Sequence, residues 1–113
     1  MRRSKLIVIA VGVAVSCSLA LGQGKKGAKA GDAAKGQEVF QQCSVCHNAD
    51  STEKKMGPGL KGLFQHDTLT NGKKPTEANV RAKIDEGGNG MPSYKEMLSD
   101  DEKDNLIAYL KTL

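Results

Sequence analysis

The sequence predicts a small all-α fold with long loops. Three segments carry apolar side chains at helical spacing, and each is preceded by a residue suited to cap a helix. No segment shows the alternating pattern of a strand, and no internal repeat is visible. A chain of 113 residues provides enough material for one modest domain.

Residues 1–22 are predicted to be an export segment. Three basic residues within the first five positions precede an apolar run over residues 6–15 and then small side chains, which is the layout of a secretory signal. The small residues Ala20 and Gly22 favour removal after Gly22. Retention as a membrane anchor and lipid attachment at Cys17 are the alternatives. All three predict a periplasmic or otherwise extracytoplasmic protein, soluble or membrane-tethered.

Residues 23–31 combine glycine and lysine with no large apolar side chain, so they are predicted to form a flexible linker. The domain that follows, residues 32–113, is mildly acidic, because six of the 17 Lys and Arg residues precede it and all 13 Asp and Glu residues lie within it. It contains no basic stripe with interleaved aromatic side chains. We therefore expect no nucleic-acid binding.

The first helix is predicted to begin after Asp32, which can cap it, and to end near Cys46. Glycine in a helix costs about 1 kcal/mol relative to alanine, so we expect another backbone to approach at Gly36. The predicted apolar stripe consists of Ala33, Gly36, Val39, Phe40 and Cys43.

A second helix is predicted between Thr76 as its cap and Gly87 as its terminator. Its apolar face carries Val80 and Ile84. Glu77 and Arg81 have the spacing of an i,i+4 ion pair. The glycine- and proline-bearing segments on either side, residues 54–75 and 87–98, are predicted to be loops.

The last helix carries the clearest local signal. Ser99 followed by Glu102 forms a capping-box pattern, and two further acidic residues lie in the first turn. The apolar stripe of this helix consists of Leu106, Tyr109, Leu110 and Leu113. A domain with three short helices, long loops and four aromatic side chains buries little apolar surface, so it needs an additional stabilising element.

The motif Cys43-Ser-Val-Cys46-His47 supplies such an element. C-x-x-C-H is the attachment signature of c-type haem, in which the two thiols bond to the macrocycle and the histidine ligates iron. A thioredoxin-like dithiol requires a βαβ context that this sequence lacks. A zinc site requires four ligands, and only the distant His66 is available as the fourth.

Residues 32–113 resemble the class I cytochromes c, since CSVCH at 43–47 and MGPGLKGLF at 56–64 occur in the order found in that family. The resemblance implies a small cytochrome c fold, with about three to five short helices around one covalently bound haem and its iron. It also implies that the carbonyl of Pro58 accepts a hydrogen bond from the second ring nitrogen of His47. Such a bond orients the ligating ring. The cofactor-binding residues implied so far are Cys43, Cys46, His47 and Pro58.

The sixth iron ligand is also implied by the resemblance. Gly90-Met91-Pro92 is similar to the bacterial form of the family's methionine loop, which implies that Met91 ligates iron opposite His47. Met56, Met97 and His66 are the alternative ligands.

The terminal segment NLIAYLKTL is similar to the family's last helix, which crosses the first helix at a glycine. This resemblance implies that Gly36 is the crossing point. Tyr109 and Leu106 are then expected to pack close to Gly36, with Phe40 alongside.

These observations predict a monomeric one-electron carrier, not an enzyme, that exchanges electrons with redox partner proteins outside the cytoplasm. With His47 and Met91 both bound, the iron has no position open to a substrate. A haem module or subunit docked on a larger oxidoreductase is an alternative. A haem peroxidase or gas sensor is a weaker alternative, because His66 is the only other histidine and no acid/base pair accompanies it.

Overall fold

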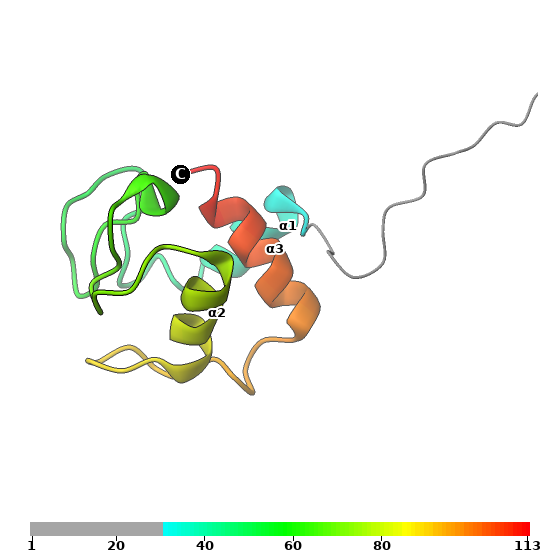
Figure 1. Cartoon of the computed structure of the whole chain (residues 1–113). Helices are drawn as coiled ribbons and strands as arrows, with labels where there is room; N and C mark the ends of the chain where they lie inside the picture. Colours follow the sequence, from blue (N-terminus) through cyan, green and yellow to red (C-terminus); the bar gives the residue numbers. More distant parts are fainter. Residues whose placement is uncertain (1–30) are drawn as a thin grey trace, which may run out of the picture.

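The structure is a computed structural model, which describes residues 31–113 and confirms the all-α class. No strand occurs within this range, where the single bridge joins Gly88 and Met91. The predicted export segment 1–22, with Cys17, and most of the predicted linker 23–31 lie outside the described residues. The elements are α1 (Ala33–Phe40), the 3-10 helix η1 (Leu63–Gln65), α2 (Glu77–Glu86) and α3 (Asp100–Leu110), as Figure 1 shows.

The helix boundaries follow the predicted capping residues. Asp32 accepts hydrogen bonds from backbone N–H groups in the first turn of α1, and Thr76 does the same for α2. Ser99 and Glu102 form both hydrogen bonds of a capping box at the start of α3. Gly87 ends α2 with φ of 67°, a conformation that glycine adopts without strain. The predicted caps are therefore confirmed.

The first helix is shorter than predicted. It ends at Phe40, and residues 41–46 continue as a series of turns and not as α-helix. The Ser44 N–H donates to the Phe40 carbonyl at 2.9 Å, whereas the Cys46 N–H donates to the Cys43 carbonyl at 3.1 Å. These bonds span four and three residues, so the chain tightens beyond the helix end. The apolar spacing persists through Cys43 because such turns keep nearly the same face.

Helices α1 and α3 form the main helix pair, and they cross next to each other in Figure 1. The rings of Phe40 and Tyr109 contact each other with centroids 5.3 Å apart and planes inclined at 55°. A Cβ added at Gly36 would lie 2.8 Å from the Tyr109 Cβ and would overlap the backbone of Asn105. The predicted close approach at Gly36 is confirmed, and its nearest partner is the Asn105 backbone.

The predicted ion pair within α2 is wrong. Arg81 instead bonds Asp104 at 2.6 Å and Asp100 at 3.0 Å, and Glu77 pairs with Lys111. All three partners belong to α3 or follow it directly. Arg81 therefore pairs with two carboxylates in the first half of α3 and not with Glu77 of its own helix.

Nine buried apolar side chains form one core. They come from all four helical elements and from the loop before α3: Phe40, Leu63, Val80, Ile84, Tyr94, Leu98, Leu106, Ile107 and Leu110. Within residues 31–113, no helix has both the length and the apolar character needed to cross a membrane.

Candidate haem site

A cavity of about 470 Å³ lies over this core. The chain reaches it from the turns after α1, from the segment before η1, from α2, from the loop after α2, and from α3. The side chains that line it include Cys43, Cys46, His47, Leu60, Leu63, Val80, Ile84, Met91, Tyr94, Leu106 and Leu110. A second cavity of the same volume, between α2 and α3, contains none of the predicted site residues. The first cavity is therefore the candidate site.

Cys43 and Cys46 are partly buried free thiols on the wall of this cavity. Burial, with a smaller contribution from the charge of Cys46, raises the pKa of Cys43 to about 11. A redox-active dithiol requires the opposite shift, because the thiolate is the reactive form. Among the described residues, no group of three or more His, Cys, Asp or Glu side chains is arranged to hold a metal ion.

His47 lies next to the two thiols, and Pro58 contacts its ring. The His47 Nδ1 and the Pro58 carbonyl oxygen are 2.8 Å apart. A carbonyl can only accept, so Nδ1 carries the proton and Nε2 keeps a lone pair available for a metal. Gly57 leaves room for this arrangement, since a Cβ there would lie 2.5 Å from His47 Cε1.

Met91 differs from the other candidates for the sixth iron ligand in its burial and its position on the cavity wall. Met91 is partly buried, packs against the core and lines the cavity. Met56 lines the rim near Cys46 but is 79% exposed, and its sulfur lies 3.9 Å from the Cys46 sulfur. Met97 is 61% exposed and is not part of the cavity wall. His66 reaches the rim as an exposed side chain.

Among the apolar lining residues, two lie outside the motifs and apolar stripes that the sequence predicted. Leu69 reaches the cavity from the loop between η1 and α2, and Tyr94 reaches it from the loop before α3. Each is an apolar side chain isolated in a polar loop, which is a weak signal that periodicity does not detect. Burial raises the pKa of Tyr94 above its ordinary value, and charges on Cys43 and Cys46 would raise it further.

Comparisons with known proteins identify the family of this chain. The sequence profile described as "Cytochrome c" matches residues 33–113. A cytochrome c2 of Rhodospirillum rubrum is 33% identical over 110 residues, covering 74% of this chain and 82% of the relative. A cytochrome c6 of Leptolyngbya boryana is 35% identical over 80 residues, covering 70% and 89%.

A solved structure of similar fold is that of cytochrome c6 from the diatom Phaeodactylum tricornutum. It has a TM-score of 0.58 and 28% sequence identity, and the similarity covers 73% of this chain and 93% of that protein. The family profile matches in sequence, and the solved structure matches in fold. The C-x-x-C-H motif and the cavity beside it are consistent with both matches. This chain therefore belongs to the cytochrome c family, whose cofactor is a covalently attached c-type haem with iron and whose role is electron transfer, not enzymatic catalysis.

Proposed function

We propose that this protein is a one-electron carrier outside the cytoplasm, with its haem anchored by Cys43 and Cys46 and ligated by His47 and Met91. One observation carries the proposal: a single cavity brings together the thiols of Cys43 and Cys46, the His47 imidazole and the partly buried Met91 thioether, whereas Met56 and His66 reach only its rim as exposed side chains. The exported location is supported by the basic and apolar pattern of residues 1–22.

The residues that line the cavity fit a c-type haem. Its volume of about 470 Å³ lies within the range of sites for small molecules and cofactors, and its floor consists of aliphatic and aromatic side chains. The chemistry of the donor set also fits, since thiols form the covalent attachment while imidazole and thioether are the ligands of cytochrome c iron. Residues 31–113 therefore contain every protein group that the proposal requires.

His47 is oriented through its hydrogen bond to Pro58. The 2.8 Å bond fixes the tautomer and the plane of the ring, so Nε2 is the atom that would bind the haem iron. Gly57 keeps the space against the ring open. These two neighbours make His47 a preorganised ligand.

Met91 is the proposed second axial ligand. It follows a tight turn in which Gly88 and Met91 exchange backbone hydrogen bonds of 2.9 and 3.1 Å. This turn limits the positions open to the partly buried side chain. Bound haem iron supplies a reversible one-electron change, and a thioether ligand favours the ferrous state.

With both axial positions filled, the protein has no coordination site for a substrate. The remaining tasks of the chain are to hold the two ligands, to exclude water with its apolar lining, and to leave one edge accessible to partners. We propose that donor and acceptor proteins bind through small, weak interfaces, as rapid turnover of partners requires. The carrier acts as a monomer in this proposal.

The experiment that tests the ligand pair is optical spectroscopy of the oxidised holoprotein. We expect a near-infrared charge-transfer band from thioether to ferric iron, and its loss in Met91→Ala. Met56→Ala and Met97→Ala are matched controls that should retain the band. An unchanged Met91→Ala spectrum would show that Met91 is not the ligand.

Two further measurements test the rest of the proposal. The reduced, unmodified protein should not bind carbon monoxide at neutral pH, whereas binding would favour a sensor or enzyme. The mass of the native protein reports haem addition, removal of residues 1–22 and any lipid on Cys17 in one value.

A further inference from the structure

Lys103 is the only charged residue that is buried among residues 31–113, with 4% of its surface exposed. It lies in the first half of α3, where a lysine would be expected to extend into solvent. Burying an ammonium group is unfavourable unless oxygen atoms compensate its charge. The partners of Lys103 therefore indicate what this residue does.

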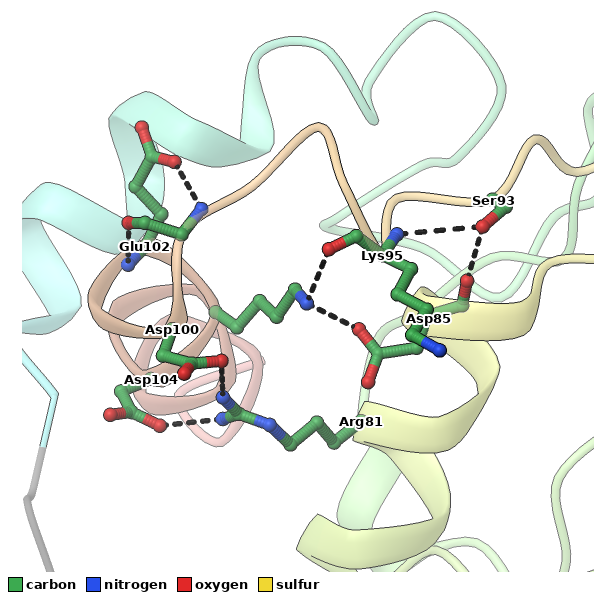
Figure 2. A network of polar contacts seen from close by, with 9 residues as sticks. Arg81, Asp85, Ser93, Lys95, Asp100, Glu102 and Asp104 are labelled. Carbon is green, nitrogen blue, oxygen red and sulfur yellow. Dashed lines mark hydrogen bonds and ion pairs between the residues drawn. The ribbon is translucent and has the colours of Figure 1, made fainter.

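Two oxygen atoms meet the Lys103 ammonium group, and they come from two different segments. Asp85 Oδ1, at the end of α2, lies 2.6 Å from Nζ, and the Lys95 carbonyl, in the loop before α3, accepts a hydrogen bond at 3.1 Å (Figure 2). Asp85 Oδ1 is itself buried and has no aligned hydrogen bond, so its contact with Lys103 is an ion pair only. The ion pair with Lys103 is thus the main compensation for its charge.

This contact is one of three ionic links between α2 and α3. Glu77, Arg81 and Asp85 lie four residues apart along one face of α2, and their partners are Lys111, the Asp100 and Asp104 pair, and Lys103. The side chains of Glu77 and Lys111 are 59% and 48% exposed, whereas that of Lys103 is 5% exposed. Of the three links, the one through Lys103 is the one that also bonds the loop before α3.

The loop that Lys103 contacts carries Met91. On the α2 side, the Ser93 hydroxyl donates to the Asp85 carbonyl at 2.5 Å (Figure 2). The Tyr94 N–H donates to the Ile84 carbonyl at 3.0 Å. On the α3 side, the attachment is the bond from Lys103 to Lys95. Residues 93–95 are thereby held at the end of α2, two to four positions after Met91.

We propose that Lys103 is a positioning residue that keeps Met91 in place for the haem iron by joining α3 to Asp85 and to the Lys95 carbonyl. The inference rests on the proposed function, in which Met91 is an axial ligand. The physical reason is the burial of the pair. Removing Asp85 leaves the buried ammonium group without its ionic partner, and removing Lys103 leaves the buried Asp85 Oδ1 without one. Opening the segment that covers the pair relieves this cost.

The test compares Lys103→Met with Lys111→Met in the oxidised holoprotein. Each variant removes one ion pair to α2. Of the two lysines, only Lys103 also bonds the loop that carries Met91. In Lys103→Met we expect the thioether-to-iron band to weaken or to disappear on heating well below the unfolding midpoint, and the reduction potential to fall. In Lys111→Met the band should persist up to global unfolding.

Hydrogen exchange provides a readout that does not use the haem spectrum. The amides of Met91 and Tyr94 are hydrogen-bonded in the loop. In Lys103→Met they should exchange about tenfold faster or more, since loss of a buried charge partner shifts the local opening equilibrium. In Lys111→Met, the exchange rates of these two amides should change no more than those of amides that exchange only through global unfolding. If Lys103→Met yields no folded holoprotein, Asp85→Asn carries the same comparison, because it removes the same ion pair and preserves side-chain size.

The outcomes separate this inference from the proposed function. A band that survives in Met91→Ala would refute both the ligand assignment and the positioning role. A band lost in Met91→Ala but unaltered in Lys103→Met, with unchanged exchange at Met91 and Tyr94, would refute the positioning role alone. Parallel loss of the band and of global stability in both lysine variants would show that Lys103 is only a structural residue.

Discussion

Gly36 of α1 lies directly against the backbone carbonyl of Asn105 in α3, with no space for a side chain between them. The Asn105 side chain also accepts a hydrogen bond of 2.8 Å from the Asp32 N–H, just before α1 begins. The crossing is therefore fixed by backbone contact at one point and by a hydrogen bond one turn away. It brings Phe40 and Tyr109 into ring contact below the cavity.

We predict that Gly36→Ala destabilises the protein. Alanine favours the helix by about 1 kcal/mol over glycine, but its methyl group would overlap a carbonyl that cannot rotate away, and overpacking costs about 1–3 kcal/mol or more. The contact involves backbone, so we expect the steric cost to dominate and the midpoint of thermal unfolding to fall by about 5–10 °C. Gln37→Ala, at the exposed neighbouring position, is the control and should leave the midpoint nearly unchanged. An unaltered midpoint in Gly36→Ala would contradict the close approach.

We predict that Gly57→Ala disturbs the histidine ligand more than it disturbs the fold. The added Cβ would lie 2.5–2.9 Å from three atoms of the His47 ring, so the ring must shift or its bond to Pro58 must break. The expected result is an altered reduction potential and a changed visible spectrum of the holoprotein. Gly72→Ala is the control: its φ of 80° strains any side chain and should lower stability, but nothing lies within 4 Å of the added atom, so the His47 ring is not contacted and the spectrum should not change. Equal spectra for the two variants would refute the contact with His47.

We predict that Ser99→Ala lowers stability by about 1 kcal/mol, the usual cost of losing a helix cap. The Ser99 hydroxyl accepts from the Glu102 N–H at 3.1 Å, and this bond has no replacement in alanine. Chemical denaturation of the holoprotein measures the difference. Ser99→Asp should restore stability, because it keeps an acceptor and adds negative charge at the helix N-terminus. Failure of aspartate to rescue would mean that the cap is not the cause.

We predict that stability falls when the pH rises past about 10, and that Tyr94 contributes to this fall. Burial raises the pKa of Tyr94, so the folded protein retains the neutral phenol at a pH where the unfolded chain ionises. The contribution is complete below the unfolded pKa and disappears as the pH rises toward the folded one. Urea unfolding midpoints measured across this range should decline less steeply in Tyr94→Phe. Identical slopes in the two proteins would refute the role of Tyr94.

We predict that the chain does not fold stably without haem. Without haem, the aliphatic and aromatic side chains that line a solvent-accessible cavity of about 470 Å³ are exposed to water, and a small domain has only about 5–15 kcal/mol of stability to offset this loss of burial. Cys43→Ala/Cys46→Ala, produced without haem, should show weak helical circular dichroism. The holoprotein, purified in parallel, is the reference. Native helical content in the haem-free variant would show that the nine-residue core suffices.

The local elements of this fold could be predicted because their signals are short in range. Asp32, Thr76 and Ser99 cap the helices as predicted, since a cap depends on a few neighbouring residues. The end of α1 could not be predicted, because turns of three- and four-residue spacing carry the apolar stripe beyond Phe40. The predicted pair of Glu77 and Arg81 was wrong because acidic and basic partners on α3 compete for both.

The sequence by itself determined the family, the helical class and the residues proposed to bind haem, since C-x-x-C-H is a local covalent motif and amphipathic spacing is a local pattern. The tertiary structure decided which groups meet. It placed Met91 on the cavity wall and left Met97 outside it, set His47 against Pro58, and buried Lys103 between Asp85 and the Lys95 carbonyl. These contacts depend on helix packing and loop closure, which join residues distant in the chain, so no periodicity in the sequence encodes them.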